Sequence, residues 1–110
     1  MSAQKLITER KRTHRCGTLR AEHIGQEVVV MGWVQTYRDL GGAVFIDLRD
    51  RTGLVQVVFD AGVDEAIHAA ADKVRNEWVI GVVGKVRSRG TNVNSKMPTG
   101  EIEILGAEIE

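Results

Sequence analysis

The chain has 110 residues, of which 27% are charged and 43% hydrophobic, and its 15 Lys and Arg residues balance 15 Asp and Glu. This length and composition suit one soluble globular domain with a single core. They exclude a membrane span, since no apolar run approaches the roughly 18–20 residues required, and the single cysteine excludes an internal disulfide and a multi-cysteine zinc site.

The charges are unevenly distributed along this neutral chain. Residues 1–20 carry six basic groups and one acidic group, and residues 85–96 carry four basic groups and no acidic one. Such patches can bind a polyanion locally, although solvated surface charge is the ordinary explanation for either patch alone. We expect residues 1–12 to be a flexible basic extension and residues 13–110 to form the domain.

The first three predicted elements are strands. Residues 27–37 are rich in valine, which is typical of a strand, and the glycine pair 41–42 ends it. Residues 43–50 alternate, which predicts an apolar face of Val44, Ile46 and Leu48 and an opposite face of Phe45, Asp47 and Arg49. After a short turn, residues 54–59 form a third apolar run that only Gln56 interrupts.

The second half predicts a helix and two further strands. Six apolar residues recur at helical spacing, with acidic residues in the first turn and basic residues in the last: Val63, Ala66, Ile67, Ala70, Ala71 and Val74. Residues 77–89 and 101–109 then alternate as strands do. We expect Trp33 and Trp78 to lie in the core.

This order of elements predicts a known small architecture. Five strands with one helix between the third and the fourth is the layout of the OB-fold, a Greek-key β-barrel. Glycines 32, 81 and 84 suit the sharp bends that a small barrel requires. A plain antiparallel sheet covered by one helix is the alternative.

Three side chains form a candidate site on the expected outer face. OB barrels commonly bind single-stranded nucleic acid across strands two and three. There, Phe45 can stack on a base, Gln56 can both donate to and accept from a base edge, and Arg38 can reach a phosphate or a base. Each residue has an ordinary alternative, a surface aromatic ring for Phe45 and a solvent-facing amide for Gln56, so their convergence on one face carries the prediction.

Further polar residues follow on strands four and five and on the loop between them. Arg87 and Arg89 lead into Asn92, and all three can face nucleic acid. Glu101 and Glu103 can accept hydrogen bonds from the N–H groups of guanine. Alternatively, these carboxylates pair with the arginines across the two strands.

The sequence offers no catalytic site. Cys16 and the three histidines lack the spacing of a nucleophile–base pair or a metal site. Asp47 and Asp50 face opposite sides of one strand, which disfavours a general acid–base pair. The sequence contains neither of two glycine-rich phosphate-binding motifs, G-x-x-x-x-G-K-[ST] and G-x-G-x-x-G.

At these residues the sequence resembles the N-terminal anticodon-binding domain of bacterial-type aspartyl-tRNA synthetases, which are class II aminoacyl-tRNA synthetases. The resemblance begins near Thr13 and covers nearly the whole chain. It is carried by HRCGTLR at residues 14–20, GWV at 32–34, RDLGG at 38–42, FIDLRDR at 45–51, GLVQVVF at 53–59 and PTGEIE at 98–103.

The resemblance implies that the domain grips the anticodon loop of aspartate tRNA and reads G, U and C. Phe45 would stack on the central uridine, with Arg38 and Gln56 contacting it, and Arg89, Asn92 and Glu103 would lie around the wobble guanine or the loop backbone. The family usually has three arginines before Asp39, and Thr36 and Tyr37 replace two of them here. One phosphate contact is therefore in doubt, although Tyr37 could still stack or donate.

The resemblance places ATP, magnesium and the ligase chemistry in a separate catalytic domain. We therefore expect no cofactor and no charging of tRNA by these 110 residues, which would be a fragment, an excised domain or a freestanding relative. The full enzyme is expected to be a cytoplasmic homodimer, and Leu40 favours a strict aspartate specificity. The alternative functions are a freestanding OB-fold protein that binds single strands without preference, and a protein–protein adaptor.

Overall fold

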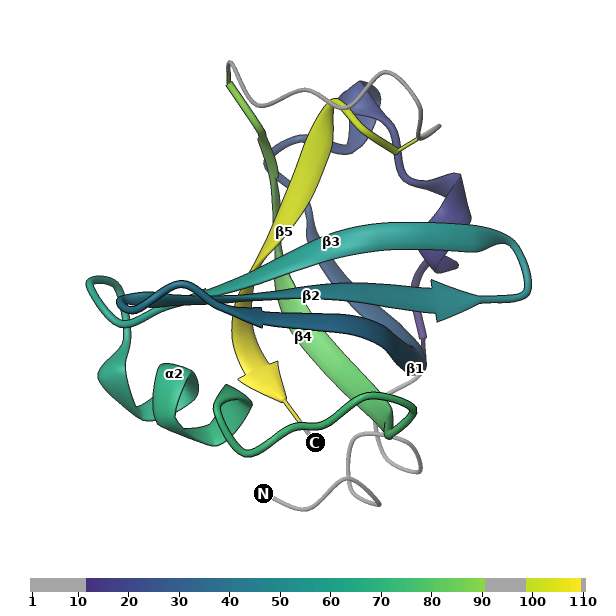
Figure 1. The fold of residues 1–110 in the computed structure, drawn as a ribbon. Coiled ribbons are helices and arrows are strands. Elements are labelled where there is room, and N and C mark those ends of the chain that lie inside the picture. The colour runs from purple at the N-terminus through teal and green to yellow at the C-terminus, as the bar shows by residue number, and fades with distance from the viewer. Residues whose placement is uncertain (1–11, 91–98, 110) are drawn as a thin grey trace.

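The computed structural model describes residues 12–90 and 99–109, and these form a closed five-stranded β-barrel with one short α-helix. The strands are β1 (Glu27–Asp39), β2 (Ala43–Asp50), β3 (Gly53–Asp60), β4 (Val79–Ser88) and β5 (Ile102–Ile109), and α2 (Glu65–Ala71) lies between β3 and β4. Figure 1 shows the helix below one end of the barrel. The predicted OB-fold layout is confirmed, and the alternative of a plain antiparallel sheet is wrong.

The strands close in the order β1-β2-β3-β5-β4. Neighbouring strands are antiparallel except β3 and β5, which run parallel where Val57 meets Ile104 and Val58 meets Leu105. β1 closes the barrel because its first half pairs with β4 and its second half with β2. The β3–β5 closure is short, because only the Val57–Ile104 and Val58–Leu105 pairs join these two strands, as is usual for the partly open barrel of an OB-fold.

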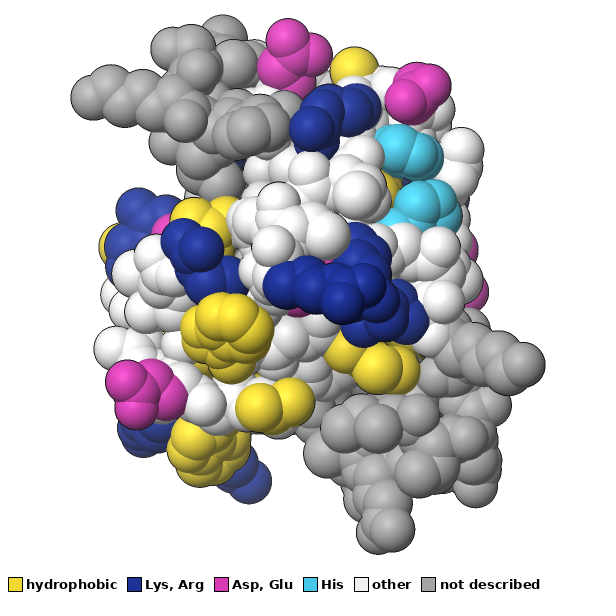
Figure 2. All heavy atoms as spheres, turned by 90° about the vertical axis from the view of Figure 1, so that its right-hand side faces the viewer, with side chains coloured by type: hydrophobic (Ala, Val, Ile, Leu, Met, Phe, Trp, Pro, Cys, Tyr) yellow, Lys and Arg dark blue, Asp and Glu magenta, His cyan; other side chains and the backbone are white. Residues whose placement is uncertain are grey.

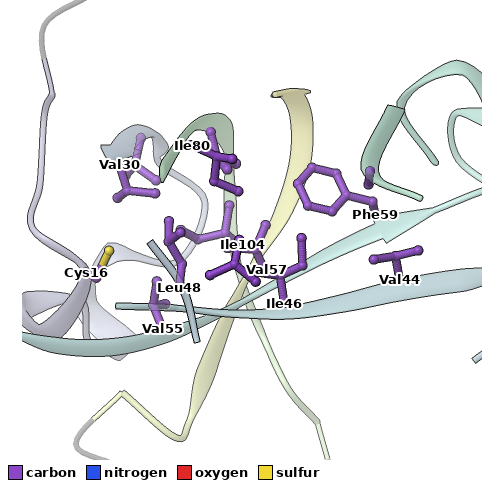
Figure 3. Close-up of a cluster of buried hydrophobic side chains, with 14 of the residues drawn as sticks. Cys16, Val30, Val44, Ile46, Leu48, Val55, Val57, Phe59, Ile80 and Ile104 are labelled. Carbon is purple, nitrogen blue, oxygen red and sulfur yellow. The ribbon is translucent and has the colours of Figure 1, made fainter. Parts of the chain in front are cut away.

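The barrel interior is filled by aliphatic side chains from all five strands. Val44, Ile46 and Leu48 are fully buried, which confirms the face predicted from the alternation of β2. Figure 3 shows Ile46 beside Val57 and Ile104, which belong to β3 and β5. Gly106 is required next to the Phe59 ring, because a Cβ at this glycine would overlap the ring.

The helix is shorter than the apolar stripe predicted. It begins after Asp64, whose side chain accepts hydrogen bonds from the N–H groups of Ala66 and Ile67, and it ends at Ala71. Ile67 and Ala71 are buried against the barrel, whereas Val63 precedes the helix and is 63% exposed. Ala66 and Ala70 are exposed, whereas Val74 is buried although it follows the helix, so the stripe was only partly correct about the packed residues and too long for the helix.

Both tryptophans lie outside the core, so their predicted burial is wrong. Trp33 is 40% exposed because it pairs with Arg49 on the outer face of the barrel. Trp78 precedes β4 and is 51% exposed. The face drawn in Figure 2 carries several exposed hydrophobic side chains beside a band of Lys and Arg.

No helix among the described residues is long and apolar enough to cross a membrane. The predicted extension, residues 1–12, falls outside the described part of the chain except for Arg12. The same holds for Asn92 on the loop between β4 and β5.

Candidate nucleic-acid interface

A hollow of about 700 Å³, here called the outer-face pocket, lies on the outside of the barrel. Its lining comes from all five strands, the loop between β1 and β2, and the residue that follows β4: Arg38, Leu40, Ala43, Phe45, Asp47, Gln56, Val58, Asp60, Arg87, Arg89 and Glu103. Six of the seven site residues expected from the sequence are in this lining, and the seventh, Asn92, lies outside the described residues.

Strand pairing brings the aromatic ring and its neighbours together. Phe45 pairs with Arg38 of β1 on one side and with Val58 of β3 on the other. Since paired residues point to the same face of a sheet, these three side chains form one row. The Arg38 guanidinium lies 5.8 Å from the centre of the Phe45 ring, within the range of a cation–π contact. Phe45 is half-buried and borders the pocket, so the expectation that it lies outside the core is confirmed.

A chain of polar contacts crosses the pocket beside this row. Arg38 Nη2 donates to Gln56 Oε1 at 3.4 Å, and Gln56 Nε2 donates to Glu103 Oε1 at 2.8 Å. Arg87 Nε donates to the other carboxylate oxygen, Oε2, at 2.7 Å. Gln56 and Glu103 are each 8% exposed, and buried polar groups of this kind require such partners.

The Arg87–Glu103 contact decides between the two alternatives left open by the sequence. Arg87 and Glu103 are direct partners across β4 and β5, and their side chains form an ion pair. The carboxylate of Glu103 is thus paired within the protein, while both side chains still border the pocket. Arg89 also borders it, and its backbone N–H donates to the carbonyl of Glu101 at 3.1 Å.

Asp47 and Asp60 are pocket residues that the sequence patterns did not indicate, and Leu40, named above only for its bearing on specificity, also lines the pocket. Asp47 accepts a hydrogen bond from the Thr36 hydroxyl at 2.6 Å. Its position two residues after Phe45 on β2 was the available signal, because alternate residues of a strand share a face. Leu40, 63% exposed, lies on the connection between β1 and β2.

Tyr37 faces away from the pocket and cannot replace an arginine there. Its hydroxyl donates to the Asp72 carboxylate at 2.9 Å, and the Arg75 guanidinium lies 6.0 Å from its ring centre. The ring packs against the core cluster. Burial and the hydrogen bond to Asp72 raise the pKa of Tyr37 to about 12. The expectation that Tyr37 could stack or donate at the site is therefore wrong.

The lone cysteine is a buried core residue. Burial, followed by the nearby Asp50 carboxylate, raises the pKa of Cys16 to about 12, so its thiol stays protonated and unreactive near neutral pH. Among residues 12–90 and 99–109, no three His, Cys, Asp or Glu side chains converge as a metal site would require.

The pocket lining is balanced in charge. Its three arginines (Arg38, Arg87 and Arg89) stand against three carboxylates (Asp47, Asp60 and Glu103). Arginine supplies only hydrogen-bond donors and a carboxylate only acceptors. Together with the ring of Phe45, this set can stack on a flat base and match both the donors and the acceptors of its edge.

Comparison with known families gives one match over most of the chain. Residues 28–110 match the tRNA anti-codon family, described as OB-fold nucleic acid binding domain. This range contains all the residues of the outer-face pocket. It also contains every strand of the barrel, lacking only the first residue of β1.

Two relatives and one solved structure are similar over most of this chain. The aspartate–tRNA(Asp/Asn) ligase of Anaeromyxobacter dehalogenans is 58% identical over 106 residues, 96% of this chain and 18% of that protein. The aspartate–tRNA ligase of Listeria welshimeri is 54% identical over 100 residues, 90% of this chain and 17% of that protein. The asparaginyl-tRNA synthetase of Pyrococcus horikoshii, solved with asparaginyl-adenylate, superposes with a TM-score of 0.74 at 28% identity, covering 92% of this chain and 22% of that chain.

The chain thus spans 17–18% of the length of these two relatives. These similarities confirm the resemblance that the sequence motifs indicated.

Proposed function

We propose a function for this chain from its family: it belongs to the OB-fold nucleic acid binding domains of the tRNA anti-codon family. Its proposed role is to hold the anticodon loop of aspartate tRNA, as the anticodon-binding domain of an aspartate–tRNA ligase. The similarity to two ligases of this kind, at 58% and 54% identity, supports the choice of tRNA.

The balanced charge of the outer-face pocket is the observation that carries this proposal. A protein that binds single strands without preference combines a positively charged groove with stacking rings. Here three carboxylates accompany the three arginines and the ring of Phe45. Carboxylates repel phosphates but accept hydrogen bonds from base N–H groups, so the lining favours reading of base edges over general attraction of a polyanion.

In the proposed complex each pocket residue has a role that its position allows. Phe45 stacks on the central uridine, and Arg38 and Gln56, which line the same pocket, contact that nucleotide. Arg87, Arg89 and Glu103 lie on the β4–β5 side of the pocket, toward the wobble guanine and the loop backbone. Asn92 is assigned to the same region from the sequence resemblance alone.

The activity of a whole ligase is part of the proposal. ATP and magnesium would serve a separate catalytic domain that attaches aspartate to the tRNA, and the 110 residues would contribute recognition only. The whole enzyme is proposed to be a cytoplasmic homodimer that acts in protein biosynthesis.

Titration of the 110-residue chain against anticodon stem-loops tests the proposed function. We expect preference for the aspartate anticodon, marked weakening when its central uridine is replaced, and weaker binding at higher salt, because releasing counterions from the phosphates gains less free energy in a more concentrated salt solution. Equal binding of all loops would indicate a general single-strand binder instead. Failure to bind any loop would leave the protein–protein adaptor as the better function.

The same titration with a stem-loop that carries the asparagine anticodon tests whether binding is restricted to the aspartate anticodon. Leu40, on the rim of the pocket, favours the strict aspartate type, so we expect the asparagine loop to bind more weakly. Equal affinity for the two loops would indicate the relaxed type.

A further inference from the structure

We propose that Glu103 is a positioning residue for base discrimination. It fixes the orientation of the Gln56 side-chain amide, and Gln56, not Glu103, is the group that reads the edge of the central base. This inference rests on the proposed function and assigns the discrimination within it to one hydrogen-bonded pair.

The amide of a glutamine needs such a support to discriminate. Its two ends have nearly the same shape, but one is an acceptor and the other a donor, so an unsupported amide can turn over and offer either pattern. Discrimination between uridine and cytosine depends on this pattern, because the two bases exchange donors and acceptors on their Watson–Crick edges. A glutamine side-chain amide that is free to turn therefore binds uridine and cytosine alike.

The partners of Gln56 determine its orientation from both ends. The Glu103 carboxylate can only accept, so it takes the Nε2 end at 2.8 Å. The Arg38 guanidinium can only donate, so it takes the Oε1 end at 3.4 Å. A turned amide would set its N–H group against the guanidinium and its oxygen against the carboxylate, which loses both hydrogen bonds.

The two ends differ in tightness, which indicates where the base enters. Glu103 is held firmly, by Gln56 at 2.8 Å and by Arg87 at 2.7 Å. The Arg38 contact at 3.4 Å is at the long limit of a hydrogen bond and involves an exposed side chain. A base can therefore displace or join the contact on the Arg38 side, next to Phe45, while the Glu103 side stays in place.

The supporting ion pair explains why the carboxylate does not move with the base. Arg87 lies directly across from Glu103 in the β4–β5 pairing, so the backbone of two strands fixes the distance between them. Gln56 and Glu103 are each 8% exposed, and a buried contact of this kind has little competition from water. The orientation of the amide is thus set before RNA arrives.

The substitution Glu103→Gln tests the proposal, since it keeps the shape and lets the new amide donate or accept. We expect the preference for uridine over cytosine at the central position to fall by about fivefold, the ratio that one ordinary hydrogen bond supplies. The affinity for a mismatched loop should rise, because one negative charge leaves the pocket. A structural defect alone would weaken both loops equally.

A double-mutant cycle identifies the residue that touches the base. If Glu103 acts through Gln56, Glu103→Gln should leave the discrimination ratio unchanged in a Gln56→Ala background. If it still lowers the ratio there, Glu103 reads the base directly and the proposal is overturned. Discrimination by the wild type that Glu103→Gln does not alter also overturns it, without affecting the proposed function.

A measurement on the free protein covers the case in which the variants do not fold. The Gln56 side-chain amide protons should exchange with water markedly more slowly than those of the exposed Gln26 in the same wild-type sample. Equal exchange would mean that the amide is not held and would overturn the inference. Wild-type protein that binds all loops equally would overturn the proposed function, and the inference with it.

Discussion

Two buried carboxylates, Asp50 and Glu103, illustrate two uses of the same chemical group. They are 6% and 8% exposed, and each accepts more than one hydrogen bond. Glu103 takes its bonds from the side chains of Gln56 and Arg87, both of which border the outer-face pocket. Asp50 takes its bonds at the opposite end of β2, away from the pocket.

The partners of Asp50 are mainly backbone groups. Its carboxylate accepts from the N–H of Cys16 at 2.7 Å and from the N–H of Thr52 at 2.8 Å, as well as from the Thr52 hydroxyl. These bonds attach the short 3-10 turn η1 (Cys16–Thr18) to the connection between β2 and β3. A carboxylate bound to backbone groups holds the fold together, whereas one bound to side chains determines how those side chains are presented.

The largest expected effect is the loss of stability in Asp50→Ala. Removing the carboxylate leaves the buried Cys16 N–H without its partner, and we expect the free energy of unfolding to fall by about 3 kcal/mol. Urea denaturation measures this value. Asp47→Ala, on the same strand but facing the pocket, should cost less than about 1 kcal/mol, and an equal cost for both would remove the distinction between the two ends of β2.

Phe45→Ala should affect RNA binding and leave the fold intact. Losing the stacking surface should weaken binding of the anticodon stem-loop by about 1–3 kcal/mol, with little change in thermal unfolding because the ring is only half-buried. Trp33→Ala is the matched control, since Trp33 is also an exposed aromatic residue of the outer face but lies outside the pocket lining. Equal weakening of binding by both variants would mean that the RNA does not pass through the outer-face pocket.

The stability of the fold should depend on pH in acid, because folding lowers the pKa of Asp50. Burial by itself raises the pKa of Asp50, but the hydrogen bonds from Thr52 and Cys16 outweigh it and leave the pKa below its ordinary value of 3.8. A carboxyl with a lowered folded-state pKa stabilises the fold above pH 3.8 and loses this contribution as the pH falls through the folded-state value.

Urea midpoints measured from pH 5 downward test this dependence. The wild type should be more stable than Asp50→Asn at pH 5, and the difference should shrink in acid. A difference that stays constant with pH would show that the charge of Asp50 contributes nothing.

The smallest expected effect concerns salt. Arg38→Gln should reduce the steepness of log K against log salt concentration by about 0.7 if Arg38 neutralises one phosphate of a single strand. Lys73→Gln, a loss of the same charge next to α2, should leave the slope unchanged. If neither substitution changes this slope, Arg38 neutralises no phosphate and contacts only the base and Phe45.

The sequence predicted elements well where alternation is regular and poorly where it is not. In β2, buried and half-buried residues alternate without interruption, so the bounds Ala43–Asp50 and both faces were predicted correctly. In β1 valines occupy both faces, and the register shifts between Val34 and Thr36. The face of Trp33 therefore could not be assigned from its neighbours.

The site was predicted more completely than its internal contacts. Phe45 and Gln56 were selected because each interrupts the pattern of its strand, and Glu103 because its carboxylate can accept hydrogen bonds from guanine. The contact between Gln56 and Glu103 depends on the β3–β5 pairing, and no pattern within a single strand encodes a contact between residues 47 positions apart. Likewise, the inward turn of Tyr37 depends on Asp72, which lies 35 positions away.

The parallel contact between β3 and β5 has a consequence for the order of assembly. The hairpins β1–β2 and β2–β3 can form from sequence neighbours, but β5 can join β3 only after the chain containing α2 and β4 has folded back. Contacts between distant segments carry the largest cost in chain entropy and slow the folding rate. We therefore expect the recognition surface to be completed late in folding, together with the equally long-range β1–β4 pairing, so that a nascent or partly unfolded chain would have the stacking ring without the means to choose among bases.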